Sequence, residues 1–307
     1  MAPPADTVLT LDHLSRWSFT GTALAVLGHP IAHSLSPLIH RAALAELGRA
    51  GGDFRDWDYF RFDVPPDRLR EALELLRARG FRGLNLTVPH KVLACDLIRD
   101  IAPEAADFGA VNTLVRAPAG WRGANTDGYG LAAALREDLG LHLAGAVVIL
   151  LGAGGAARGA AVECLRRGCA ALWIANRTRA HLESLLAQLR PLAGRIPLQG
   201  FDPASPPPGL PAGALVINAT SAGLRPEDPA PVDLGRLPRP GAVVDMIYRP
   251  AVTALLRQAA ALGVPRANGL AMLVHQGAKS LELWTGVPPE RTVPAMLRAA
   301  RAAPGSG

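Results

Sequence analysis

Lysine is almost absent from this chain of 307 residues. Of its 32 cationic residues only Lys91 and Lys279 are lysines, and the others are arginines. An arginine keeps its charge in proteins, whereas a lysine can lose its proton where the surroundings disfavour the charge. Lys91 ends the segment GLNLTVPHK, which indicates a residue kept for proton chemistry. Lys279 lies in a helical segment away from such a motif and is interpreted as a surface residue.

Cysteine is scarce as well. Cys95, Cys164 and Cys169 form no CxxC pair and no metal-ligand spacing, and three residues cannot make an even disulfide set. Each falls in an expected amphipathic helix, where a free cysteine behaves as a small hydrophobe. We therefore expect no metal site, and the composition favours a reducing cytoplasmic location.

Long apolar runs and basic tracts are also missing. No uninterrupted apolar stretch approaches the ~20 residues that a membrane-spanning helix needs. The start, MAPPADTVLTLDHL, lacks the basic region and apolar core of a signal peptide. The net charge is +6, but the arginines are spread along expected helices such as 68–80, without a basic run interleaved with aromatics. Neither a membrane nor a nucleic acid is an expected partner.

What is present is a regular alternation of strand and helix patterns in a chain of which 49% is apolar. This alternation is typical of parallel α/β sheets, and the length allows two domains. Strands are predicted at 22–28, 57–64, 83–87, 171–178, 214–220 and 242–248, with a pair of short strands in 111–127. Helices are predicted at 37–48, 65–80, from Pro89 onward, at 128–139, after a glycine turn near 154, and at 269–286 and 288–303.

The glycine turn carries the first functional motif. Gly152, Gly154 and Ala157 form a G-x-G-x-x-A pattern between the apolar strand AVVILL and a helix. Such a turn lets the backbone approach a pyrophosphate and directs a helix N-terminus at its charge. It predicts a dinucleotide site, although a glycine turn needed only for helix packing is the alternative.

The end of the next strand indicates which dinucleotide is bound. An NAD enzyme places an acidic residue there, about 20 residues after the turn, to hold the ribose 2′-OH. This chain has Asn176 followed by Arg177, Thr178 and Arg179. Guanidinium groups bind a 2′-phosphate and no carboxylate repels it, which predicts NADP(H). The alternative is that both arginines face solvent at a helix start.

Five polar clusters lie where strands meet loops or helices. They contain Ser34 and Ser36; Asn85, Thr87 and Lys91; Asn112; Asp127; and Gln276. Together they would suit a small, polyhydroxylated, anionic ligand. Taken singly, each has a structural interpretation, because such residues often cap helices or form turns.

The order of the motifs is more specific than any one of them. GHPIAHSLSP, NLTVPHK, GAVNT, NTDG, GAGGAAR, NRT, INATSAG, DMIYRP and GLAMLVHQGA resemble, in this order, the motifs of the shikimate dehydrogenase family. The resemblance covers nearly the whole chain, from residue 24 to residue 300. It implies the reversible NADPH-dependent reduction of 3-dehydroshikimate to shikimate, a step in aromatic amino-acid biosynthesis.

The resemblance also implies a fold of two α/β domains. An N-terminal substrate-binding domain, 1–127, would be completed by C-terminal helices in 267–307, and a Rossmann-type doubly wound NADP-binding domain would span 128–266. Whether the protein is a monomer or a homodimer stays open, since family members occur as both.

The resemblance assigns roles to residues that match the family motifs. Lys91 and Asp127 match the catalytic pair, Ser34 and Ser36 the carboxylate binders with Tyr248 nearby, and Asn85, Thr87, Asn112 and Gln276 the groups that hold ring hydroxyls. The expected cofactor-binding residues are Gly152, Ala153, Gly154, Gly155, Ala156, Asn176, Arg177, Thr178, Arg179, Thr220, Met246 and Gly269. One departure is His181, where the family often has a further basic residue, and it weakens the prediction of a strong NADP preference.

A lysine suits this chemistry because hydride transfer to a ketone creates an alkoxide that needs a proton and a nearby positive charge. Lys91 would lie in the first turn of a helix, where the helix dipole disfavours a cation by about 0.3–1 kcal/mol. Asp127 would act in the opposite direction and hold the amine in place. Ser36 favours shikimate as the main substrate, because a bulkier residue there accompanies quinate use in the wider family.

Three alternatives remain from the sequence. A quinate/shikimate or aminoshikimate dehydrogenase is the nearest. Glutamyl-tRNA reductase shares the glycine turn and an NRT-like strand end, but it needs a nucleophilic cysteine and a tRNA-binding extension. A catalytically inactive nucleotide sensor is the third, and the presence of both Lys91 and Asp127 argues against it.

Overall fold

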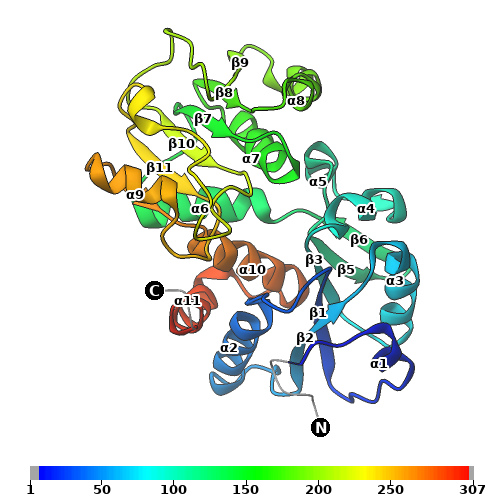
Figure 1. The fold of residues 1–307 in the computed structure, drawn as a ribbon. Coiled ribbons are helices and arrows are strands. Elements are labelled where there is room, and N and C mark those ends of the chain that lie inside the picture. Colours follow the sequence, from blue (N-terminus) through cyan, green and yellow to red (C-terminus); the bar gives the residue numbers. More distant parts are fainter. Residues whose placement is uncertain (1–6, 304–307) are drawn as a thin grey trace. The chain divides into compact units, whose positions relative to one another are not determined.

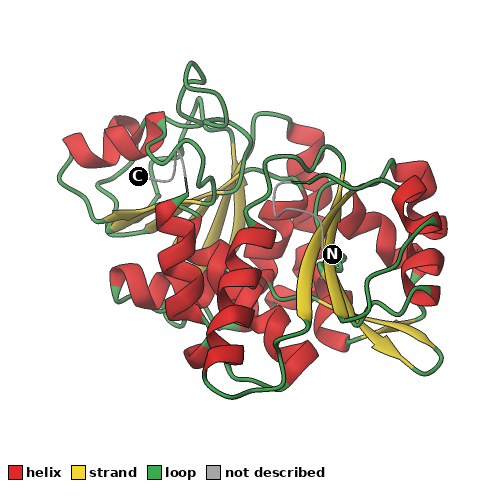
Figure 2. Ribbon diagram, turned by 90° about the horizontal axis from the view of Figure 1, so that it is seen from below, coloured by secondary structure: helices red, strands yellow, loops and turns green. Residues whose placement is uncertain are grey.

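The structure, a computed structural model, describes residues 7–303 (Figure 1). These residues separate into two compact units, one of 7–126 with 274–303 and the other of 127–273. The second boundary falls inside helix α10 (Leu270–Thr285), which therefore begins in one unit and ends in the other. In each unit helices lie on both sides of the strands (Figure 2).

A six-stranded mixed sheet forms the centre of the first unit, in the order β2-β1-β3-β5-β6-β4. Its strands are β1 (Thr22–Gly28), β2 (Trp57–Asp63), β3 (Gly83–Leu86), β4 (Asp100–Ile101), β5 (Thr113–Ala117) and β6 (Gly120–Ala124). β1 pairs in parallel with β2 and β3, whereas β5 is antiparallel to both β3 and β6. The strands predicted at 22–28, 57–64, 83–87 and within 111–127 are confirmed, and only the two-residue β4 was not predicted.

Most helices of the first unit begin where the sequence pattern placed them. They are α1 (Leu11–Ser15), α2 (Ser36–Arg49), α3 (Leu69–Ala78) after the 3-10 turn η1 (Pro66–Arg68), α4 (His90–Leu97), α5 (Pro103–Phe108) and, after α10, the turn η3 (Pro289–Arg291) and α11 (Val293–Ala302). Proline stands in the first turn of α2, where its missing N–H has no partner to lose. α1 and α5 were not predicted, because each is too short to show a helical period.

The C-terminal helices belong to the first unit: the end of α10 packs on its sheet, and α11 packs against α2. The indole nitrogen of Trp284, in α10, donates a hydrogen bond to the carbonyl of Leu114 in β5 at 3.0 Å. A Cβ atom on Gly83 in β3 would lie only 2.1 Å from the same nitrogen. β3 therefore has a glycine at this position because the tryptophan ring occupies the space of a side chain.

The second unit is built on a parallel sheet in the order β12-β11-β10-β7-β8-β9. Its strands are β7 (Val147–Leu151), β8 (Ala171–Ala175), β9 (Leu198–Phe201), β10 (Leu215–Asn218), β11 (Ala242–Asp245) and β12 (Arg266–Ala267). Its helices are α6 (Asp127–Leu139), α7 (Gly155–Arg166), α8 (Arg179–Ala193) and α9 (Ala254–Ala261), with the 3-10 turn η2 (Leu234–Arg236). Read from β9, this is the 3-2-1-4-5-6 order of a Rossmann-type doubly wound sheet, as predicted.

Within residues 7–303 we looked for membrane-spanning helices, clusters of metal ligands and disulfides. Among these residues no helix is both long enough and apolar enough to cross a bilayer, and no group of three or more His, Cys, Asp and Glu side chains is arranged to hold a metal ion. The three cysteines are free; Cys164 and Cys169 are buried and Cys95 is partly buried. Burial raises the pKa of the Cys164 and Cys169 thiols, so both stay protonated hydrophobic groups at neutral pH.

Candidate active site

The glycine turn leaves a helix N-terminus open for an anion. Gly152 has a φ of +115°, and a Cβ there would lie 3.0 Å from Cγ2 of Thr220. α7 begins at Gly155 with Gly154 as N-cap, and that cap supplies no side-chain hydrogen bond. A Cβ on Gly154 or Gly155 would meet nothing within 4 Å. The N–H groups at the start of α7 are therefore free of a side-chain cap, as a phosphate-binding turn requires.

A cavity of about 490 Å³ adjoins this turn in the second unit. Among the predicted cofactor residues it is lined by Gly152, Ala153, Gly154, Asn176, Arg177 and Thr220. Gly155, Ala156, Thr178, Arg179, Met246 and Gly269 do not line it. It is also lined by Ser221 and the segment 228–231, which were not predicted as site residues.

Arg177 and Arg179 differ in their surroundings. Arg177 lines the cavity. Nε of Arg179 instead forms an ion pair with Glu183 one helical turn later, at 2.7 Å, and its side chain is 89% exposed. The cavity thus offers one guanidinium group, that of Arg177, and is also lined by Asn176, whose amide donates to the carbonyl of Thr178 at 2.8 Å.

Two buried polar residues that were not predicted as site residues, Asn218 and Asp245, form a hydrogen-bond network behind the lining residue Thr220. Oδ1 of Asn218 accepts hydrogen bonds from the backbone N–H and the hydroxyl of Thr220, at 3.0 and 2.8 Å. Its amide donates to Oδ1 of Asp245 at 2.9 Å, and the same carboxylate group accepts the hydroxyl of Thr253 at 2.7 Å. Burial raises the pKa of Asp245. Both residues belong to the INATSAG and DMIYRP motifs, which was the signal available in the sequence.

The remaining predicted residues of the second unit lie after β11. Gly269 approaches the backbone of Met246 so closely that a Cβ would stand 2.1 Å from its carbonyl oxygen. Its N–H donates to the carbonyl of Ile247 at 3.1 Å. Tyr248 is partly buried, and this burial raises the pKa of its hydroxyl. Tyr248 belongs to the second unit, whereas Ser34 and Ser36 belong to the first.

In the first unit the serine motif lies at the start of α2. The hydroxyl of Ser34 accepts the N–H of Ser36 at 3.3 Å, so the pair forms a local turn. The buried guanidinium of Arg61 donates to the carbonyls of Ala32 and Ser34 and holds this turn against β2. Ser36 is buried, with its carbonyl facing Nδ1 of His40 at 2.8 Å.

Asn85 lies inside a hydrogen-bond network of the first unit. Its Oδ1 accepts the hydroxyl of Tyr59 at 2.7 Å, and its amide nitrogen donates to the carbonyl of Asn112, to Thr113 and to Ser280 at 3.1, 3.2 and 2.9 Å. Only 5% of the residue is exposed. Thus the amide is oriented by protein partners on both of its ends. Tyr59 and Ser280 were missed, because no motif in the sequence includes them.

Asn112 holds the segment that leads into α6. Its Oδ1 accepts the backbone N–H of Thr126 at 2.8 Å, and its amide nitrogen donates to the hydroxyl of Thr126 at 2.9 Å and to Oε1 of Gln276 at 3.3 Å. The residue is 1% exposed. Asp127 follows Thr126 directly and is the first residue of α6.

Lys91 occupies the first helical turn of α4, as predicted from Pro89, which is the N-cap. Its carbonyl accepts the N–H of Val111 at 2.8 Å, which attaches this turn to the GAVNT segment. Thr87, two residues before the cap, donates its N–H to the carbonyl of Leu27 at 2.9 Å. Gly28 must lack a side chain here, because its Cβ would stand 2.5 Å from Cγ2 of Thr87.

Two protein-family models match this chain, one in its N-terminal part and one near its C-terminus. Residues 26–114 match the family model described as shikimate dehydrogenase substrate binding domain, and residues 269–301 match the one described as shikimate 5'-dehydrogenase C-terminal domain. A shikimate dehydrogenase (NADP(+)) of Symbiobacterium thermophilum is 42% identical over 270 residues, covering 87% of this chain and 90% of the relative.

Solved structures give the same result. Shikimate 5-dehydrogenase of Thermus thermophilus, solved in complex with NADP(H) and shikimate, superposes with a TM-score of 0.77 at 36% identity, covering 91% of this chain and 99% of the other. The ligand-free 5-ketofructose reductase of a Gluconobacter strain superposes with a TM-score of 0.79 at 33% identity, covering 92% and 99%. With relatives this similar over most of its length, the chain belongs to the shikimate dehydrogenase family.

Proposed function

We propose that this protein catalyses the reversible NADPH-dependent reduction of 3-dehydroshikimate to shikimate, a step of the shikimate pathway to chorismate and the aromatic amino acids. It is an oxidoreductase acting on a CH–OH group, and its substrate is a small molecule. The observation that carries this assignment is the 42% identity to a shikimate dehydrogenase (NADP(+)) across 87% of the chain.

NADP is the cofactor, and the residues around the glycine turn fit it. Gly152 keeps the turn free of a side chain, the start of α7 offers N–H groups to the pyrophosphate, and Arg177 offers a guanidinium to the 2′-phosphate. The nicotinamide supplies the hydride when the cofactor is bound. We assign Gly155, Ala156, Thr178, Met246 and Gly269 to the same site on the family motifs, although they do not line the cavity.

Lys91 and Asp127 are the proposed catalytic pair. Nζ of Lys91 gives a proton to the oxygen of the reduced ketone and takes it back in the reverse direction, and the Asp127 carboxylate holds the amine in place. Support comes from the position of Lys91 in the first turn of α4, which the Val111 N–H attaches to the GAVNT segment through the Lys91 carbonyl.

Substrate contacts are assigned to the polar residues of the first unit together with Tyr248. Ser34 and Ser36 bind the carboxylate, and Thr87, Gln276, Asn85 and Asn112 face the ring hydroxyls. The amides of Asn85 and Asn112 already have protein partners, so we expect them to act mainly by holding the site in shape.

The proposal also covers the oligomeric state and the cellular compartment of the protein. A monomer or a homodimer in the cytoplasm is the proposed form, and the three free thiols support a reducing compartment. Analytical ultracentrifugation of the full chain would distinguish the two assemblies by mass.

One spectrophotometric assay tests the function. Shikimate is supplied with NADP and then with NAD, and the absorbance of the reduced nicotinamide is followed. We expect turnover with shikimate, a kcat/KM higher for NADP than for NAD, and weaker activity on quinate. Fructose, a polyol of similar size without a carboxylate, serves as the control and should give no turnover. Absence of turnover with shikimate would favour the nucleotide sensor, and equal kcat/KM for shikimate and quinate would favour the broader dehydrogenase.

A further inference from the structure

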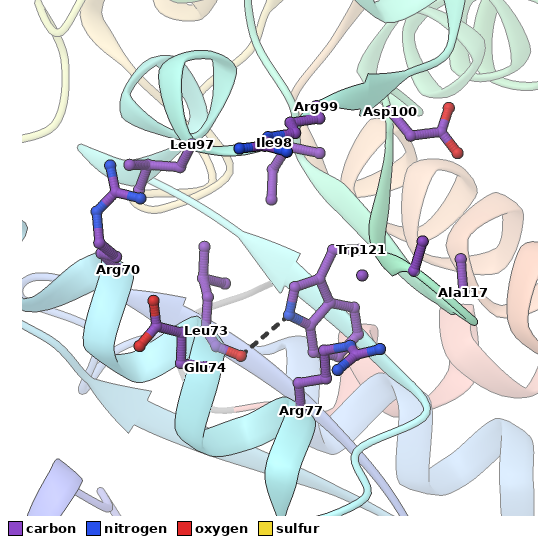
Figure 3. A pocket seen from close by; sticks show the side chains of 12 residues that line it. Arg70, Leu73, Glu74, Arg77, Leu97, Ile98, Arg99, Asp100, Ala117 and Trp121 are labelled. Carbon is purple, nitrogen blue, oxygen red and sulfur yellow. Dashed lines mark hydrogen bonds between the residues drawn. The ribbon is translucent and has the colours of Figure 1, made fainter.

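A second cavity, of about 420 Å³, lies wholly within the first unit and shares no residue with the proposed catalytic site. It opens between α3, the end of α4, β4 and the turn that joins β5 to β6 (Figure 3). Its volume lies within the ~300–1,000 Å³ of small-molecule sites in proteins. None of the residues assigned to the proposed reaction lines it.

Part of the lining of this cavity is apolar. Leu73 and Ile98 are buried, and Trp121 is 7% exposed. The indole nitrogen of Trp121 donates to the carbonyl of Leu73 at 3.0 Å, which is drawn in Figure 3. With its one polar atom already bonded, the tryptophan presents only apolar ring surface, which suits an apolar or aromatic group.

Charged groups of both signs also line the cavity. Arg70 and Glu74 project from α3 on one side, Arg77 lies next to Trp121, and Arg99 lies above (Figure 3). The side chains of Arg70 and Glu74 make no hydrogen bond or ion pair with each other or with any other residue in the described range 7–303. They are therefore available to a ligand.

The guanidinium group of Arg77 is only partly hydrogen-bonded within the protein. One terminal nitrogen donates to the carbonyl of Pro118 at 2.7 Å, which fixes the side chain. Its Nε is buried and has no hydrogen-bond partner among residues 7–303. Because Nε is not accessible, the contribution of Arg77 to the lining of the cavity comes from the rest of its side chain.

We propose that this cavity binds a free α-amino acid with an apolar side chain, preferably an aromatic one. The guanidinium groups of Arg77 and Arg70 receive the carboxylate, Glu74 receives the ammonium group, and the side chain packs on Trp121. A doubly charged anion such as phosphate fits less well, because Glu74 and Asp100 stand at the same site. The inference does not depend on the reaction that the enzyme catalyses.

Isothermal titration calorimetry of the full chain tests the ligand class. L-phenylalanine is titrated beside 3-phenylpropionate, which lacks the ammonium group, and phenethylamine, which lacks the carboxylate. We expect saturable binding of phenylalanine with a Kd at or below about 1 mM, and binding of either analogue weaker by about tenfold or more. Phenylpropionate binding as tightly as phenylalanine would overturn the proposal, as would no saturable heat with phenylalanine.

Variants test the location. Glu74→Gln and Arg77→Gln should each weaken phenylalanine binding by about tenfold while kcat/KM on shikimate stays within about twofold. Glu74 is exposed, so its replacement leaves folding intact even if the Arg77 variant is unstable. Arg16→Gln and Glu290→Gln, exposed residues of the same unit outside the cavity, are the matched controls and should bind normally. Unchanged binding in the Glu74 variant, or displacement of phenylalanine by shikimate, would place the ligand elsewhere and refute the assignment.

Discussion

The side-chain oxygen of Asn112 accepts the backbone N–H of Thr126 at 2.8 Å, immediately before Asp127. The neighbouring residue, Val111, donates its N–H to the carbonyl of Lys91, also at 2.8 Å. Two adjacent residues of GAVNT thus hold both the helical turn that carries Lys91 and the chain that enters Asp127. This arrangement gives the GAVNT motif a structural role: it attaches the backbones that present the two proposed acid–base residues.

Replacing Lys91 with arginine tests the proton chemistry. Lys91→Arg keeps the positive charge but removes a group able to release a proton, so we expect kcat to fall by about 10²–10⁴-fold. The KM for shikimate should stay within about tenfold, because the charge remains. Steady-state kinetics with NADP provide the measurement.

The only other lysine is the matched control for this change. Lys279 forms an ion pair with Glu282 at 2.5 Å, which an arginine can also form, so Lys279→Arg should retain normal kcat. Near-normal turnover in the Lys91 variant would remove this residue from the chemistry.

Arg177 is expected to set the cofactor preference. Arg177→Gln removes the guanidinium that lines the dinucleotide cavity, so the KM for NADP should rise by about tenfold while the KM for NAD changes little. Arg179→Gln is the comparison, since that side chain is paired with Glu183 and mostly exposed; a smaller effect is expected. If the Arg179 change has the larger effect on NADP, the assignment of the two arginines must be reversed.

Buried His40 should make stability fall in mild acid. Its ring stacks on Tyr59 with a centroid distance of 4.1 Å, and burial lowers the pKa of His40 to about 4. In the unfolded chain the pKa returns to about 6.5, so the unfolded state binds the proton first as the pH falls. The contribution of a neutral His40 is complete above pH 6.5 and decreases by roughly 3 kcal/mol as the pH approaches 4.

Urea unfolding at several pH values measures this dependence. In His40→Phe, which keeps a ring beside Tyr59, the free energy of unfolding should depend less on pH between 6.5 and 4 than in the wild type. His181→Gln, at an exposed position of α8, should follow the wild-type curve. Parallel curves for wild type and His40→Phe would show that His40 does not titrate in the way described.

Gly83 should tolerate no side chain. An added Cβ would stand 2.1 Å from the indole nitrogen of Trp284, so Gly83→Ala should lower the free energy of unfolding by about 1–3 kcal/mol or more. Gly209→Ala is the control, because a Cβ there meets nothing within 4 Å and the expected change is within about 0.5 kcal/mol. Equal stability of the two variants would mean that α10 is free to move away from β3.

The elements most accurately predicted were those whose signal is local. The helix from Ser36 follows from a proline at its start and a helical pattern of apolar residues, and the strand at 22–28 follows from a short apolar run before a glycine. The strand Leu198–Phe201 escaped prediction because its exposed middle carries a glutamine and a glycine, and its pairing with β8 alone makes it a strand.

The sequence by itself determined the α/β class, the dinucleotide turn at Gly152 and the order of motifs, because turns, helix starts and strand periods depend on near neighbours in the chain. It predicted parallel sheets, but the sheet of the first unit is mixed, because the antiparallel pairing of β5 is a long-range contact. Only the tertiary structure decided that Arg177 rather than Arg179 lines the dinucleotide cavity, and that Asn85 is engaged by protein partners. The partners of Asn85 include Ser280, 195 residues away, and no local pattern can predict a hydrogen bond over that separation. Folding brings such residues together, and burial then compels their polar groups to pair.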